Sequence, residues 1–145
     1  AALWTIPARR MKARREHVVP LPAQTVQMLH RLHAISGDRI HLFPGRDDRN
    51  KPMSVHSIRQ ALKVLGWSGT YSPHGTRTTG STRLNEMGYR PDAIEAQLAH
   101  AEPNSVRRTY NHATYLEERR DMMQAWADKL ELWKRESTGE VSRTQ

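Results

Sequence analysis

Residues 72–110 read SPHGTRTTGSTRLNEMGYRPDAIEAQLAHAEPNSVRRTY, and this stretch of the 145-residue chain is the one that decides the fold. It predicts a helix from about Thr76 to Gly88 and a second helix that Pro91 opens, because proline is well tolerated in the first turn. A short helix further on would carry Tyr110. The apolar positions expected to face the core are Leu84 and Met87 in the first helix and Ile94 and Leu98 in the second.

Upstream of this stretch, the chain reads as a hairpin followed by two helices. Short strands at residues 3–6 and 17–19 flank a basic connection without glycine, which predicts an antiparallel pair with an unclear turn type. A helix is expected from Pro22 to about Ser36, and Ser54 suits the N-cap of a helix that Gly66 ends. Their apolar stripes would comprise Val26, Leu29, Leu32, Val55, Ile58, Leu62 and Leu65.

Downstream, a long helix is predicted from about Tyr115 to Trp133. Leu116, Met123 and Leu130 recur every seven residues and form an apolar seam beside Trp126 and Trp133. Packing on the chain's own core is the simpler use of that seam. Residues 134–145 are polar and are expected to form a disordered tail. The fold class is therefore mixed α+β, mainly helical, with a small antiparallel sheet.

The composition favours a polyanionic partner. The chain has 23 Lys and Arg against 15 Asp and Glu, a formal charge of +8, which suits DNA, RNA or an acidic membrane surface. Cysteine is absent, which excludes disulfides, thiol catalysis and cysteine–zinc sites. The 8 histidines suggest no metal-ligand set with nearby carboxylates, so neither a metal nor another cofactor is expected. Without a membrane-spanning run or signal peptide, a cytoplasmic protein is expected.

Five residues in a fixed order suggest chemistry on a phosphodiester: Lys12, His74, Arg77, His100 and Tyr110. A guanidinium binds two phosphate oxygens and keeps its charge, and residues three apart on a helix share a face. A histidine can donate to the same phosphate or help to move a proton. A tyrosine hydroxyl can attack phosphorus, and a lysine can protonate the leaving oxygen.

Each of these residues has an ordinary interpretation when it is taken alone. His-x-x-Arg is common by chance, His100 could cap a helix, and Tyr110 could be half-buried. Lys12 is one of five basic residues between Arg9 and Arg15, where it could simply contact phosphate. The order and spacing of the five residues together are much more specific than any one of them. The prediction of phosphodiester chemistry therefore rests on the whole set.

In that order and spacing the chain resembles the tyrosine recombinase (phage integrase) family, whose pattern is His-x-x-Arg, then Leu-Gly-His, then a tyrosine about ten residues on. The chain has HGTR at 74–77, LAH at 98–100 and Tyr110, with Ala99 in place of the usual glycine. NEMGY at 85–89 and AIEAQLAH at 93–100 resemble integrases of the P4 type, as do WTIP at 4–7 and YLEERR at 115–120. The likeness runs from about Trp4 to Trp126.

The resemblance implies the DNA breaking–rejoining fold, with residues 1–133 as the C-terminal part of the catalytic domain and its N-terminal part missing. It makes Tyr110 the nucleophile, Lys12 the lysine of the hairpin turn, and His74, Arg77 and His100 the other catalytic residues. The implied function is integration or excision of a prophage or mobile element through a 3′-phosphotyrosine link. Double-stranded DNA would be the partner, in a bacterial host at the nucleoid.

The resemblance also implies that the chain alone is inactive in cleavage, because the family's first catalytic arginine lies upstream of the hairpin. Its last helix would dock on a neighbouring protomer in the recombination complex. Two other functions remain open: a basic DNA-binding module without chemistry, and an interaction domain that uses the last helix. Tyr115 is the rival nucleophile, although it lies farther from His100 than the pattern requires.

Overall fold

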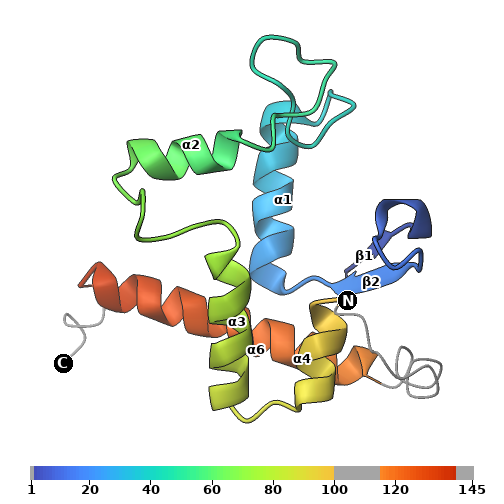
Figure 1. The fold of residues 1–145 in the computed structure, drawn as a ribbon, viewed down its shortest axis with the longest axis vertical. Helices are drawn as coiled ribbons and strands as arrows, with labels where there is room; N and C mark the ends of the chain where they lie inside the picture. The colour runs from blue at the N-terminus through green and yellow to red at the C-terminus, as the bar shows by residue number, and fades with distance from the viewer. Residues whose placement is uncertain (1, 100–114, 140–145) are drawn as a thin grey trace. The chain divides into compact units, whose positions relative to one another are not determined.

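The computed structural model of the chain describes residues 2–99 and 115–139, and within them it is mainly helical with one two-stranded sheet (Figure 1). The chain divides into two compact units. Residues 1–26 and 82–145 form the first unit, and residues 27–81 form the second. The boundaries between the units fall inside helices α1 (Ala23–Ser36) and α3 (Gly75–Glu86). The predicted class, mainly helical with a small antiparallel sheet, is confirmed.

The sheet of the first unit is the predicted hairpin. Strand β1 (Leu3–Ile6) pairs antiparallel with β2 (His17–Pro20), with Leu3 opposite Pro20 and Ile6 opposite His17. A short 3-10 helix, η1 (Ala8–Arg10), starts the connection. Arg14 then takes a left-handed backbone conformation with φ of 52°, which non-glycine residues adopt uncommonly. The connection therefore turns back without glycine.

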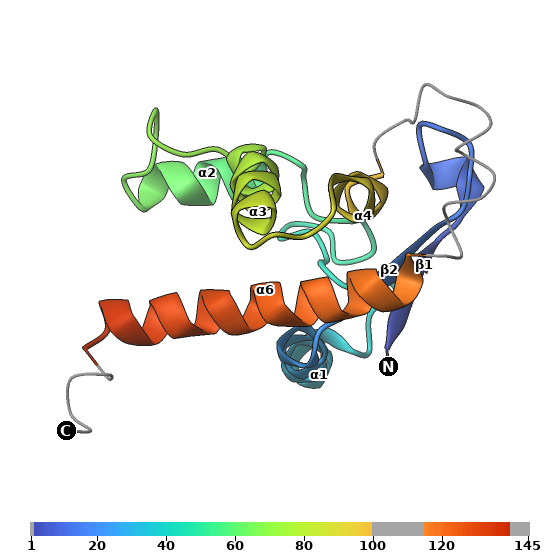
Figure 2. The same ribbon diagram turned by 90° about the horizontal axis from the view of Figure 1, so that it is seen from below.

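The core of the first unit joins α3, α4 (Pro91–Gln97) and α6 (Leu116–Ser137). Its buried residues are Leu84, Ala93, Ile94 and Met122, and the last three are fully buried. Gly88, with φ of 83°, ends α3 and lets the chain turn into α4. Figures 1 and 2 show α4 beside the first turns of α6, which also contact β2. The predictions of a Pro91 helix start and of buried Leu84 and Ile94 are confirmed.

Helix α6 departs from its prediction in length and in its buried face. Arg119 and Met122 are buried within it, whereas Leu130 of the predicted seam is 46% exposed. The seam prediction is confirmed in part: Met123 and Trp126 are partly buried against the core that α3 and α4 supply, but the fully buried position is Met122. The helix also continues to Ser137, so residues 134–137, expected in the tail, are helical. An ion pair between Arg135 and Glu131, one turn apart, supports this extension.

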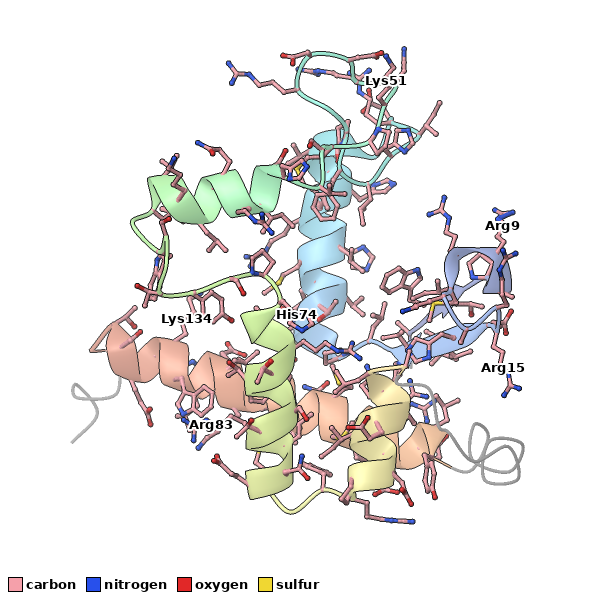
Figure 3. All side chains as sticks on the ribbon, viewed as in Figure 1. Arg9, Arg15, Lys51, His74, Arg83 and Lys134 are labelled. Carbon is pink, nitrogen blue, oxygen red and sulfur yellow. The ribbon has the colours of Figure 1, made fainter. Side chains whose placement is uncertain are left out.

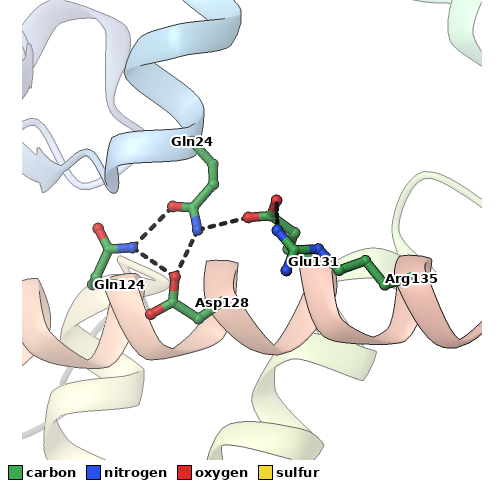
Figure 4. Close-up of polar contacts among 5 residues, drawn as sticks. All are labelled: Gln24, Gln124, Asp128, Glu131 and Arg135. Atoms are coloured by element: carbon green, nitrogen blue, oxygen red, sulfur yellow. Dashed lines mark hydrogen bonds and ion pairs between the residues drawn. The ribbon is translucent and has the colours of Figure 1, made fainter. Parts of the chain in front are cut away.

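A polar network fixes the start of α1 to α6 within the first unit (Figure 4). The backbone N–H of Ala23 donates to the side chain of Gln124 at 2.9 Å. The Gln24 amide donates to Asp128 at 2.6 Å and to Glu131 at 3.3 Å. This donation and the nearby Arg135 guanidinium lower the pKa of Glu131. The first turn of α1 is therefore placed by hydrogen bonds as well as by Pro22, which is buried just before it.

The second unit contains the rest of α1, helix α2 (Ser57–Val64) and the first turns of α3. The predicted N-cap at Ser54 is wrong: Ser54 instead accepts the N–H groups of His56 and Ser57 in a turn that precedes the helix. The expected apolar stripe of this helix is largely exposed, with Val55 at 86% and Leu65 at 69%. The short helical segments of this unit offer too little surface to bury such a stripe.

Replacement of Met122 by alanine is predicted to destabilise the first unit. Met122→Ala is expected to lower the free energy of unfolding by about 2–5 kcal/mol, because it leaves a cavity in a closed core. Leu130→Ala on the same helix is the matched control, and a change within about 0.5 kcal/mol is expected there because Leu130 is half-exposed. Urea denaturation of the chain measures both; equal losses would contradict the described core.

Candidate active site

Lys12 lies in the connection of the hairpin, within the first unit. It follows η1 in a turn that the N–H of Arg14 closes on the carbonyl of Met11 at 3.0 Å. Lys12 and four arginines around it are exposed: Arg9, Arg10, Arg14 and Arg15. Figure 3 shows Arg9 and Arg15 projecting from this loop. The hairpin thus presents five cations close together, a surface suited to a phosphate backbone.

His74 and Arg77 lie together in the second unit, at the start of α3 (Figure 3 labels His74). The carbonyl of His74 accepts the N–H of Arg77 at 3.1 Å, so the helical turn begins at His74 and the two side chains share a face. The N–H of Gly75 is satisfied by Ser72, through both its carbonyl and its hydroxyl. His74 is exposed and Arg77 is half-buried. The predicted pair is therefore brought together in one turn, where the helix dipole favours anions.

An open hollow of about 690 Å³ lies between α2 and the start of α3. Arg59 and Lys63 line it from α2, and Gly75, Thr78 and Thr79 line it from α3. His74 and Arg77 are not among its lining residues. The pair therefore occupies a different face of α3 from the one that lines the hollow.

The end of α4 leads directly to His100. Leu98 closes the helix with its N–H on the carbonyl of Ile94 at 3.0 Å. Ala99 then adopts φ of 51°, in the left-handed region. Glycine is the residue that adopts this conformation at least cost, so the backbone at Ala99 suits the glycine of the Leu-Gly-His pattern that residues 98–100 resemble. His100 and Tyr110 lie outside the described residues.

Ala99→Gly is predicted to stabilise the chain. Glycine adopts the left-handed conformation without the steric strain of alanine, which stabilises the folded chain, but it also gives the unfolded chain more freedom. The net result is expected to be a free energy of unfolding higher by about 0.5–1 kcal/mol. Ala96→Gly, inside α4, is the matched control and should lower it by about 1 kcal/mol. Urea denaturation gives both values. Equal destabilisation at the two positions would show that residue 99 is not left-handed in solution.

Tyr115, the rival nucleophile, is 8% exposed and its hydroxyl group is engaged. It accepts from the Arg90 guanidinium at 3.3 Å and donates to Asp92 at 3.5 Å. The same guanidinium lies 4.9 Å from the centre of the Tyr115 ring. A phenol with these contacts is poorly placed to attack a phosphodiester, which argues against Tyr115 as a nucleophile.

Arg119 is a residue whose role the sequence did not reveal. It is 1% exposed, and its Nε donates to the Gln97 side chain at 2.9 Å. The terminal nitrogen Nη2 of Arg119 donates a hydrogen bond to the backbone carbonyl of Val18 at 2.6 Å. In the sequence Arg119 is one charge in a run of charges, which is typical of a solvated helix face. Only its spacing from Tyr115 and Met122, one turn each way, could have indicated burial.

Lys12 belongs to the first unit and the His74–Arg77 pair to the second. In the described part of the chain, no three His, Asp or Glu side chains gather as metal ligands would. Nor is any helix there long and apolar enough to cross a membrane.

Known proteins resemble this chain over most of its length. The model of the phage integrase family matches residues 1–117. Prophage integrase IntA of Escherichia coli K12 is 48% identical over 128 residues, which cover 88% of this chain and 31% of that protein. The integrase of Shigella phage Sf6 is 45% identical over 88% of this chain and 33% of its own length. The integrase of Enterobacteria phage P4 is 42% identical over 90% of this chain and 34% of its own length.

The chain thus spans about a third of the length of the curated relatives it matches. No solved structure was found to match it.

Proposed function

The chain belongs to the phage integrase family, and on that basis we propose that it is part of a site-specific recombinase that cuts and rejoins double-stranded DNA through Tyr110. The proposal implies integration or excision of a prophage or mobile element. It also implies association with further protomers in the recombination complex, and a place at the nucleoid in the cytoplasm of a bacterial host.

The proposed reaction is a transesterification at one phosphodiester. The Tyr110 hydroxyl oxygen bonds to phosphorus, its proton passes to solvent or to His100, and the bond from phosphorus to the 5′ oxygen breaks. Lys12 protonates that leaving oxygen. Arg77 and His74 bind the non-bridging oxygens, where negative charge grows in the transition state. The DNA remains attached as a 3′-phosphotyrosyl ester, and attack by a 5′-hydroxyl of another strand reverses the step.

The observation that carries this proposal is the His74–Arg77 pair in the first turn of α3. One turn places an imidazole and a permanently charged guanidinium on the same face. The half-burial of Arg77 restricts its side chain, so less conformational freedom is lost when it binds phosphate. The engaged hydroxyl of Tyr115 supports Tyr110 as the nucleophile.

The chain matches about a third of the length of its curated relatives, so the cleavage reaction is best tested with the remaining part of a relative in place. A chimera therefore provides the test: the upstream part of E. coli IntA followed by this chain in place of the matching part. The substrates are nicked duplexes from the junctions of the IntA prophage and of the element that encodes the chain. Cleavage releases a short fragment, which prevents rejoining and traps the covalent adduct.

The expected result is a protein–DNA band that survives denaturing electrophoresis and disappears after protease treatment. IntA itself is the control for the upstream part and the substrate. A chimera that binds the duplex but forms no adduct, where IntA forms one, would contradict the proposal.

That outcome would favour the second candidate, a DNA-binding module without chemistry, which the five exposed cations of the hairpin support. Both functions predict an affinity that falls steeply with salt concentration. Binding alone therefore does not separate them, whereas the adduct does.

A further inference from the structure

The guanidinium of Arg119 is fully buried, and its partners among the described residues are neutral oxygens. Its hydrogen bonds there end on the side-chain oxygen of Gln97 and the backbone carbonyl of Val18. Burial lowers the pKa of Arg119, because the charged form loses its hydration. Burying a cation costs free energy, and an apolar side chain of similar volume would often serve the core as well. The contacts of Arg119 therefore point to a role other than stability.

Gln97, the last residue of α4, is the point where two polar contacts meet. Gln97 accepts from Arg119 through its side chain, and its backbone carbonyl accepts from His17 at 3.2 Å. Since a carbonyl only accepts, Nε2 of His17 carries the donated proton. His17 is 6% exposed and neighbours Val18 in β2. Gln97 is thus held by its side chain and its backbone, three residues before His100.

Arg119 also lies one turn into α6, where its own N–H donates to the carbonyl of Tyr115 at 2.8 Å. Tyr115 is itself fixed by Arg90 and Asp92. The described residues on either side of 100–114 are therefore each held by side-chain contacts, at Gln97 and at Tyr115. Both His100 and Tyr110 belong to that interval.

We propose that Arg119 is a positioning residue for DNA cleavage, whose buried guanidinium fixes the end of α4 against β2, three residues before the candidate catalytic residue His100. This inference rests on the proposed function. Arg119 does not touch the DNA; it acts through Gln97. A displacement of about 1 Å at a reacting group can cost about 100-fold in rate, so loss of these hydrogen bonds should slow the chemistry more than it weakens DNA binding.

Arg119→Lys in the chimera tests the inference, because lysine keeps the charge but does not reproduce the two-armed contact. The expected result is a 10- to 100-fold lower rate of adduct formation in single turnovers at saturating DNA, about the range for a misplaced group. DNA affinity should stay within about twofold, and the circular dichroism spectrum should be unchanged. Arg135→Lys, an exposed change on the same helix, should leave the rate unaltered.

A double-mutant cycle with His100→Ala separates positioning from a merely structural role. If Arg119 acts through His100, Arg119→Lys should slow a chimera that already carries His100→Ala by less than about twofold. Losses that multiply would overturn the inference, as would an unchanged rate in the single variant. Should Arg119→Lys fail to fold, Gln97→Met removes the acceptor of the same hydrogen bond and takes its place in the cycle.

Different experimental results would overturn the proposed function and the proposed role of Arg119. Absence of the adduct from the unsubstituted chimera, where IntA forms one, overturns both. A normal adduct that depends on Tyr110, combined with multiplicative losses for Arg119 and His100, overturns the role of Arg119 alone.

Discussion

Tyr110→Phe is expected to abolish the covalent adduct in the chimera while DNA binding persists. Phenylalanine lacks the hydroxyl oxygen that bonds to phosphorus, so no ester forms however well the DNA is held. The remaining cations still contact the backbone, and affinity should stay within about threefold because phosphate contacts supply most of it. The measurement combines denaturing electrophoresis of the trapped adduct with a mobility-shift titration of the same preparation.

Tyr115→Phe is the matched control for this prediction. It removes the hydroxyl that Arg90 and Asp92 contact, so the free energy of unfolding should fall by about 1 kcal/mol. The adduct should still form, because Tyr115 takes no part in the reaction. The reverse pattern, an adduct lost with Tyr115→Phe and kept with Tyr110→Phe, would transfer the nucleophile to Tyr115.

Arg77→Ala is expected to have the second-largest effect, a loss of about 10³-fold or more in the rate of adduct formation. The guanidinium stabilises charge on the phosphoryl oxygens, and arginines with this task supply about 10³–10⁵-fold in other phosphoryl transfers. Single-turnover kinetics at saturating DNA measure the loss. Arg77→Lys should recover only part of the rate, because an ammonium lacks the planar two-armed geometry.

Arg83→Ala on the same helix is the control for Arg77. Arg83 pairs with Glu86 at 2.8 Å on the exposed part of α3, and its removal should change the rate by less than about twofold. If Arg77→Ala and Arg83→Ala weaken DNA binding equally and neither affects chemistry, both arginines are ordinary backbone contacts. That outcome would support the DNA-binding module.

Much of the fold could be predicted from the sequence, because local signals coincide with the final structure. Pro91 marks the start of α4, and the short strands predicted at residues 3–6 and 17–19 pair as the hairpin. The start of α2 could not be predicted, because Ser54 closes a turn on Ser57 and does not cap the helix. Residues with strong capping preferences serve turns equally well.

Residues of the candidate site could be predicted from the sequence only where they lie close together along the chain. His74 and Arg77 share a turn, which their spacing alone predicts. Arg119 could not be found in this way, because its partners lie in α4 and β2, far away along the chain. A buried arginine between charged neighbours looks like a solvated one until tertiary packing is known. The burial of Met122, which the seven-residue repeat does not include, likewise follows from packing against α3 and α4.

The central claim is that Tyr110 forms the bond to DNA, and peptide mapping of the trapped adduct tests it most directly. After nuclease and trypsin digestion, the peptide from Thr109 to Arg119 contains both Tyr110 and Tyr115, and fragmentation by mass spectrometry distinguishes them. The account predicts a nucleotide remnant on Tyr110. A remnant on Tyr115 or on any other residue would contradict it.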